Sequence, residues 1–248
     1  MRSRWSYVYF LFYLAIGFVM LFLSNDVSKA VITLMNIIVV LTPLVGTVFG
    51  VMHYYNSREF TELLLAQPLK RSTIFLGQYI GLSLSLGLSL TLGLAIPFAA
   101  YGIFESAEIW NFASLLMVGG FLTFIFVALA YNMGLLFENK IKGFGYAILL
   151  WLILAVIYDG LFLICLLMFD DYPLDKFALM ATVFNPIDLS RILILLKLDI
   201  SALFGYTGAT FKLFLGTSKG ILVALGVLSA WVVLPAWNIL RMAKKKDF

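Results

Sequence analysis

Long apolar stretches alternate with short polar ones along the chain, and six of the apolar stretches are long enough to cross a membrane. They cover residues 7–23, 31–54, 73–100, 112–137, 144–169 and 220–240. A bilayer core about 30 Å thick needs roughly 20 apolar residues per helix. Because the stretches are continuously apolar, the pattern predicts spanning helices rather than a barrel. We therefore expect one all-α integral membrane domain over residues 1–248, with six transmembrane helices.

Composition supports this interpretation. Of the 248 residues, 63% are hydrophobic and only 12% are charged, far more apolar surface than one soluble core can hide. This excludes an ordinary soluble domain, and we expect contact with membrane lipid and none with nucleic acid. The first apolar stretch is as long as a full span and has no small-residue cleavage site after it, so we expect it to remain in the mature protein.

The charges indicate an orientation. With the N-terminus inside, the cytoplasmic ends hold eleven of the seventeen basic residues: Arg2, Arg4, Arg58, Lys70, Arg71, Lys140, Lys142, Arg241, Lys244, Lys245 and Lys246. The outer segments hold eight of the thirteen acidic ones: Asp26, Glu105, Glu108, Asp170, Asp171, Asp175, Asp188 and Asp199. An excess of Lys and Arg marks cytoplasmic loops, so both termini are expected in the cytoplasm.

A charged hairpin over residues 56–78 separates the second and third stretches, and it predicts a short amphipathic helix over about 56–68. Asn56 is the expected cap and Pro68 the expected end, while Ser72 is expected to cap the next span. One helical face carries Phe60, Leu63, Leu64 and Gln67, and the other carries Arg58, Glu59, Thr61 and Glu62. A helix that grips a soluble partner and an ordinary solvated loop fit this pattern equally well.

The segment over about residues 170–218 is the least membrane-like part. Asn185 followed by Pro186 predicts a helix start, with Asn185 as the cap. The piece after it is short and contains Asp188, Arg191 and Lys197, so we expect an amphipathic helix at the outer surface. A seventh span here would put the basic C-terminal tail outside, against the charge rule.

Small residues in the spans predict close helix packing. The third span contains Gly77, Gly81, Gly87 and Gly93. The second contains Pro43, Gly46 and Gly50, and the fourth contains Gly119 and Gly120.

Few residues could carry chemistry. Asp159 is the clear embedded charge; it could lie on a transport path, accept a hydrogen bond from another helix, or sit in water near the outer end. The single histidine, His53, is more typical of an interfacial residue than of a ligand. With one histidine and with Cys165 as the one cysteine, we expect no metal site and no catalytic constellation, and hence no enzyme.

The hairpin EFTELLLAQPLKRSTIFLGQYIG and the six-span topology resemble the ABC-2 family of ABC-transporter permeases. The resemblance rests on Glu59, Glu62, Leu63, Leu64, Pro68, Arg71 and Gly77. It implies a permease subunit of the bacterial inner membrane that pairs with a second copy. It also implies that a separate ABC ATPase binds ATP and Mg, because this chain has no phosphate loop and no cofactor of its own.

The resemblance also implies roles for individual residues. The hairpin helix would couple to the ATPase through Arg58, Glu59, Glu62 and Arg71 and through the apolar Phe60, Leu63 and Leu64, with Pro68 at its end. The outer stretch FNPIDLSRILILLKLDISALFGYTGATF is similar to that of permeases that help to assemble the copper centres of nitrous oxide reductase. A periplasmic accessory protein would then dock at Asn185, Pro186, Asp188 and Arg191.

The cargo in that case would be a sulfur or copper species. Two alternatives stay open: an ABC-2 exporter of lipid, polysaccharide or drug, and a secondary carrier without an ATPase. A carrier is expected to have more embedded charge than Asp159 alone.

Overall fold

The computed structural model describes residues 4–24, 27–169, 175–197, 212 and 214–245, and these form helices joined by short turns. Six long apolar helices account for the six predicted spans, which confirms that prediction. They are α1 (Arg4–Ser24), α2 (Val27–Asn56), α4 (Arg71–Ala100), α5 (Ile109–Leu136), the continuous run of α6 (Lys140–Leu152), η2 (Ile153–Ile157) and α7 (Tyr158–Met168), and α11 (Ser218–Lys245). Their length and composition are those of a multi-pass membrane protein.

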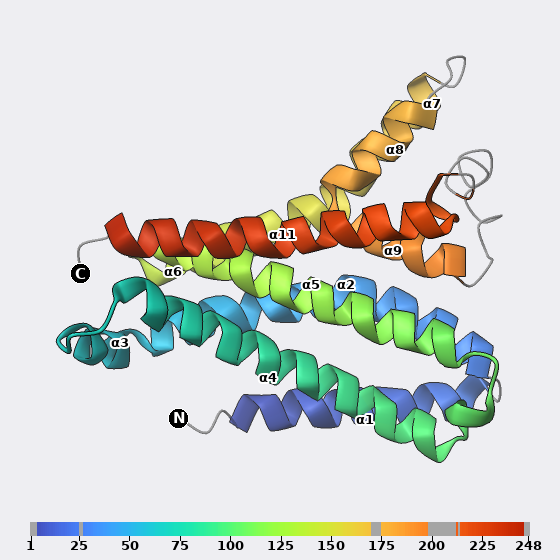
Figure 1. Ribbon diagram of the computed structural model, residues 1–248, viewed down its shortest axis with the longest axis horizontal. Helices are drawn as coiled ribbons and strands as arrows, with labels where there is room; N and C mark the ends of the chain where they lie inside the picture. The colour runs from blue at the N-terminus through green and yellow to red at the C-terminus, as the bar shows by residue number, and fades with distance from the viewer. Residues whose placement is uncertain (1–3, 25–26, 170–174, 198–211, 213, 246–248) are drawn as a thin grey trace.

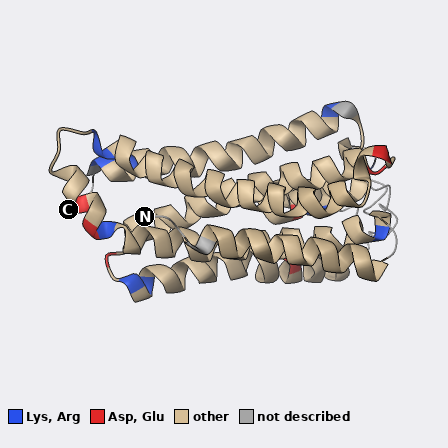
Figure 2. Cartoon of the chain, turned by 90° about the horizontal axis from the view of Figure 1, so that it is seen from below, with Lys and Arg blue, Asp and Glu red and all other residues tan. Residues whose placement is uncertain are grey.

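The spans lie roughly side by side along the long axis of the molecule, except that α7, the second half of the fifth span, runs obliquely away from the bundle (Figure 1). α5 is central: it packs along α2, and α4 and α11 also contact it, while α1 packs along α4. Lys, Arg, Asp and Glu gather at the two ends of the bundle, and the long middle carries few of them (Figure 2). Such an uncharged belt is what the hydrocarbon layer of a bilayer requires.

Two of the predicted glycine contacts bring helix backbones close together. A Cβ atom on Gly50 of α2 would lie 2.6 Å from the Cβ of Ala130 on α5. A Cβ on Gly93 of α4 would lie 2.8 Å from the Cβ of Tyr13 on α1. Other glycines depart from the prediction, because a Cβ on Gly77, Gly81 or Gly120 would have nothing within 4 Å.

The short hairpin helix is α3 (Arg58–Leu65), followed by a turn that contains Pro68. Its predicted caps are wrong. Asn56 is the last residue of α2, and its side chain accepts a hydrogen bond from Lys140 Nζ at 3.2 Å. Ser57 occupies the N-cap position, but its hydroxyl donates to His53 O at 2.7 Å. Ser72 lies inside α4, where Lys70 is the N-cap residue.

In the segment after the fifth span, residues 175–197 form two helices, α8 (Asp175–Phe184) and α9 (Pro186–Lys197), bent by 114° at Asn185. They are long and apolar enough to count together as one broken span. The predicted surface helix is not what is found, because α9 packs against α2, α5 and α11 and buries Ile187, Leu189 and Ile194. It is inserted into the bundle because its apolar residues outnumber its charged ones, and because Arg191 pairs with Asp159 and lies close to Asp188.

A short 3-10 turn, η1 (Ile103–Glu105), joins α4 to α5. Gly102 precedes it with a φ of 85°, a left-handed conformation that favours glycine.

Candidate functional site

α3 carries the residues that the sequence assigns to a partner subunit. Its apolar side chains are unusually open to the surroundings: Phe60 is 60% exposed and Leu63 is 70% exposed. Arg58 Nε donates to Glu62 Oε1 at 3.1 Å in an exposed ion pair, and Glu59 is exposed beside it. The helix therefore offers an amphipathic surface at one end of the bundle (Figure 1).

The remaining predicted residues lie close by in the chain. Leu64 is half-buried, whereas Pro68 and Arg71 are exposed in the turn and at the start of α4. Of the eight residues that the resemblance assigns to coupling with an ATPase, seven are thus exposed and accessible to another molecule: Arg58, Glu59, Phe60, Glu62, Leu63, Pro68 and Arg71.

Thr61, expected on the polar face of α3 but given no role there, anchors the helix to the bundle. Its hydroxyl is buried, donates to Ser57 O at 2.7 Å and accepts a hydrogen bond from Gln78 Nε2 at 2.8 Å. Gln78 belongs to α4, so the bond fixes α3 to the next span. A threonine on the polar face, followed one or two turns into the next helix by a glutamine, is the signal that could have found it.

A second polar site lies where the fifth span meets α9. Arg191 Nη1 of α9 donates to Asp159 Oδ2 of α7 at 2.7 Å and lies 3.5 Å from Asp188 Oδ1. The Arg191 and Asp159 side chains are 27% and 26% exposed. Of the three roles left open for Asp159, the structure thus provides the hydrogen bond from another helix.

Asn185 ties this ionic cluster to the helix break. As predicted, it caps α9: its Oδ1 accepts from Ile187 N at 3.0 Å. Its Nδ2 donates to Asp188 Oδ2 at 2.9 Å and to Leu154 O at 2.8 Å. Leu154 lies in η2, a π-helical turn in which backbone hydrogen bonds are rearranged and carbonyls become available.

Two further side chains, not identified from the sequence, hold the end of α8. Tyr158 OH donates to Ala181 O at 2.6 Å, and Trp231 Nε1 of α11 donates to Val183 O at 3.3 Å. The last carbonyls of a helix lack partners within that helix, so these bonds satisfy groups that lipid cannot.

The burial of this region corrects the expected docking surface. Asn185 is fully buried, and Pro186 and Asp188 are buried as well, while Arg191 is half-buried. The expectation that Asp188 and Arg191 lie at an exposed helix start is therefore wrong. Asp188 and Arg191 can face neighbouring helices because they have polar partners inside the bundle. Arg191 pairs with Asp159, and Asp188 accepts a hydrogen bond from Asn185.

Asn185 provides a prediction with a matched control. We expect Asn185→Ala to lower the free energy of unfolding by about 2 to 4 kcal/mol, from the lost cap and from buried partners left unpaired. Asn139 caps α6 in the same way, accepting from Ile141 N at 2.9 Å, but it is exposed. Asn139→Ala should cost only about 1 kcal/mol. Equal losses in denaturant unfolding of the purified protein would contradict the role given to the Leu154 and Asp188 contacts.

His53 lies near the α3 end, in a ring cluster with Tyr54 and Tyr131. Its Nδ1 is 2.6 Å from Tyr131 OH. Within the described ranges no three metal-ligating side chains of the His, Cys, Asp and Glu types gather in one place.

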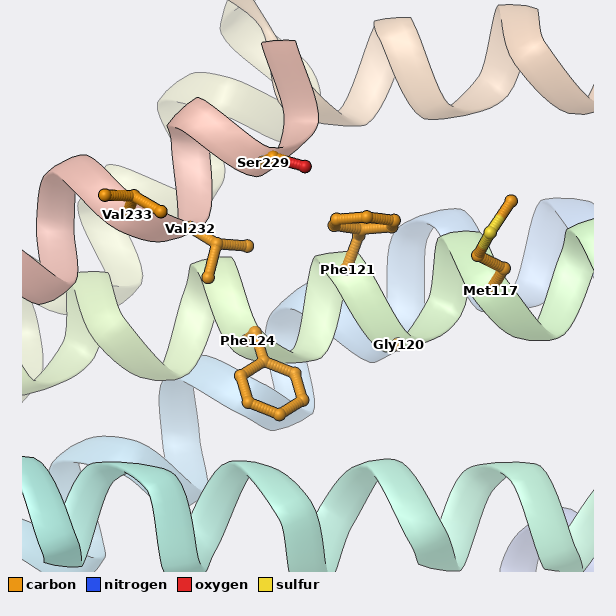
Figure 3. Close-up of a pocket in the computed structure, with 7 residues that line it drawn as sticks. All are labelled: Met117, Gly120, Phe121, Phe124, Ser229, Val232 and Val233. Carbon is orange, nitrogen blue, oxygen red and sulfur yellow. The ribbon is translucent and has the colours of Figure 1, made fainter. Parts of the chain in front are cut away.

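An apolar pocket of about 410 Å³ lies between α5 and α11. Figure 3 shows Phe121 directed toward α11 and Phe124 directed to the opposite side. Its one hydroxyl, on Ser229, donates to Leu225 O at 2.8 Å, so the pocket presents no free polar group. It has the character of a lipid-facing surface rather than of a reaction site.

Comparison of the sequence with protein-family models and with curated proteins finds no match.

Proposed function

We propose that this chain is the permease subunit of an ATP-driven transporter of the ABC-2 type, in which a separate subunit hydrolyses ATP. Two copies would pair in the bacterial inner membrane. Each would place α3 in a cleft of its ATPase, so that closure of the ATPase tilts α2 and α4, the spans on either side of α3.

The observation that carries this proposal is the exposed surface of α3. Large apolar side chains at a charged end of the bundle are costly in water, and Phe60 and Leu63 lie on a helix that also presents Arg58, Glu59 and Glu62. Thr61 and Gln78 couple this helix to α4, so a force on α3 would be transmitted to a span. The basic residues at the same end favour a cytoplasmic position.

The narrower proposal concerns the cargo. By resemblance of the outer stretch, the transporter would move a sulfur or copper species for the copper centre of nitrous oxide reductase, with a periplasmic accessory protein. The buried Asn185, Pro186 and Asp188 do not enter this proposal as docking residues; they hold α9 in place. An ABC-2 exporter of lipid, polysaccharide or drug would also need α3 to couple to an ATPase, so it stays open as an alternative.

A secondary carrier is the second candidate, and a specific observation favours it. Broken helices and embedded charges near the break are typical of carriers. The α8–α9 break and the π-helical turn lie beside Asp159, Asp188 and Arg191, so this region holds more charge than Asp159 alone.

Purification of the tagged chain from its native membrane in mild detergent tests both candidates. An ATP-binding subunit that elutes with the chain is the result expected of the ABC-2 permease. A periplasmic protein in the same complex would support the maturation transporter. A chain that elutes alone and transports in liposomes without ATP would overturn the proposal in favour of a carrier.

A further inference from the structure

A groove runs along α4 at the α3 end of the bundle. It consists of two hollows of about 600 Å³ each, which share His53, Gly81 and Leu82 and are therefore continuous. Residues of α3 bound the first hollow, and residues near the start of α1 bound the second. The groove thus lies where α3 meets the three spans α1, α2 and α4.

The groove is closed where α1 and α4 come into contact. Its last lining residue along α4 is Leu92, and a Cβ on the next residue, Gly93, would lie 2.8 Å from the Cβ of Tyr13 on α1. Tyr13 OH lies 2.9 Å from the hydroxyl oxygen of Thr42, which is halfway along α2. The groove therefore extends from the α3 end to about the middle of the membrane, and packed helices close it there.

Ser85 lies deep enough in the groove to be inside the hydrocarbon layer. It lines the second hollow and precedes Gly93 by eight residues, so at 1.5 Å per residue it lies about 12 Å from the closed end. Half of a hydrocarbon core about 30 Å thick measures about 15 Å. At this depth a side chain is surrounded by hydrocarbon, by protein or by a water-filled space.

The first hollow contains an acceptor without a donor. The Thr61 hydroxyl gives its own proton to Ser57 O, so Gln78 Nε2 is the donor in the 2.8 Å bond between Gln78 and Thr61. Gln78 Oε1 is buried, and no described residue donates to it. An amide oxygen left in this state is costly, and lipid chains have no donor to offer, whereas water has two.

A donor without an acceptor lies where the two hollows join. His53 Nδ1 is 2.6 Å from Tyr131 OH, and the hydroxyl donates because it has no other acceptor in the part of the chain that the structure describes. The proton of the neutral ring is then on Nε2, which has no hydrogen bond to a described residue. Water in the groove would accept this hydrogen bond, and hydrocarbon would not.

The second hollow adds hydroxyl groups to this polar lining. Ser6 Oγ lies 2.8 Å from Ser85 Oγ, and a hydroxyl has one donor and two acceptor positions. Whichever of the two donates, the Ser85 oxygen keeps at least one acceptor position for water. The described residues that line the two hollows include no Lys, Arg, Asp or Glu, so the lining suits water and not a bound ion.

We propose that the groove is a water-filled vestibule and forms the half of the transport path on the α3 side. The cargo that fits it is a small water-soluble solute, because a lipid would need no aqueous path. The vestibule rests on the transport role proposed above, but not on the identity of the ATPase. α2 and α4 form two of its walls, so the tilt of these spans would change its width.

Reaction of single cysteines with a membrane-impermeant methanethiosulfonate reagent tests the vestibule in membrane vesicles. The full chain carries Cys165→Ser, so that each introduced cysteine is the one thiol. Glu138→Cys is exposed at the α3 end, and it identifies the side of the membrane from which that end is reached. We expect Ser85→Cys to react from that side and not from the other.

Leu84→Cys is the matched control. Leu84 directly precedes Ser85 in α4 and is 48% exposed, whereas Ser85 is half-buried, but Leu84 lines neither hollow. Ser85→Cys should react at least about tenfold faster than Leu84→Cys, because the reactive thiolate forms in water and not in hydrocarbon.

Two results would overturn the vestibule. A Ser85→Cys protein as unreactive as Leu84→Cys would mean that lipid fills the groove. Equally fast reaction of both variants would mean that this part of α4 lies outside the hydrocarbon layer. An ATPase that elutes with an unreactive Ser85→Cys protein would refute the vestibule alone and leave the permease assignment standing.

Discussion

Replacement of Glu59 and Glu62 together by lysine is expected to abolish the ATP turnover that depends on the permease, while the protein still inserts and folds. Both carboxylates are exposed on α3, and the one ion pair they make, Glu62 with Arg58, is a surface pair worth at most about 0.5 kcal/mol. A partner cleft that complements the present charges would meet four units of changed charge. Like charges placed opposite one another in an interface cost several kcal/mol, enough to prevent docking.

The measurement is ATP hydrolysis by the ATPase subunit reconstituted with each variant in liposomes. Glu138→Lys is the control, because Glu138 is exposed at the same end of the bundle but lies outside α3. It should leave turnover near the wild-type value. Unchanged turnover in the double variant would remove the coupling role of α3, and with it the main support for an ABC-2 permease.

The spans and one cap could be predicted from the sequence because each depends on local pattern. Hydropathy over about 20 residues identified all six long helices, and the Asn185 and Pro186 pair located the start of α9. The error at Asn56 has a local cause as well. α2 extends to Asn56, and the Ser57 hydroxyl bonds back to His53 O, so neither side chain is available to cap α3.

The position of α9 could not be predicted in the same way. Judged alone, a 12-residue helix that contains Asp188 and Arg191 is too short and too polar to be embedded. Its burial depends on Asp159, which lies 32 residues away from Arg191 in sequence, and on the Leu154 carbonyl of a π-helical turn. Such pairings between distant segments have no periodic signature, although an aspartate in one apolar stretch and an arginine in another is a reason to consider them.

The openness of Gly77 and Gly81 has a similar origin. Small residues in a span indicate that a neighbour can approach closely, but they do not say which neighbour does. At Gly93 the neighbour is α1, whereas no described residue lies within 4 Å of a Cβ added at Gly81. The same sequence signal thus marks helix packing at one end of α4 and an open groove at the other.

Arg191→Gln is expected to destabilise the protein by on the order of 3 kcal/mol, because it leaves Asp159 and Asp188 without their shared cation inside the bundle. Arg58→Gln removes the exposed pair with Glu62 and should cost no more than about 0.5 kcal/mol. Unfolding of the two variants in the same detergent gives the comparison.

A triple variant separates the cost of unpaired charge from the loss of the arginine itself. If the carboxylates cause the instability, adding Asp159→Asn and Asp188→Asn to Arg191→Gln should restore most of the lost free energy, since no uncompensated charge remains. Equal stability of Arg191→Gln and Arg58→Gln would mean that water reaches the cluster. If transport were also lost in that stable Arg191→Gln protein, the cluster would lie on the path of the cargo, and the secondary carrier would become the better account of the broken α8–α9 pair.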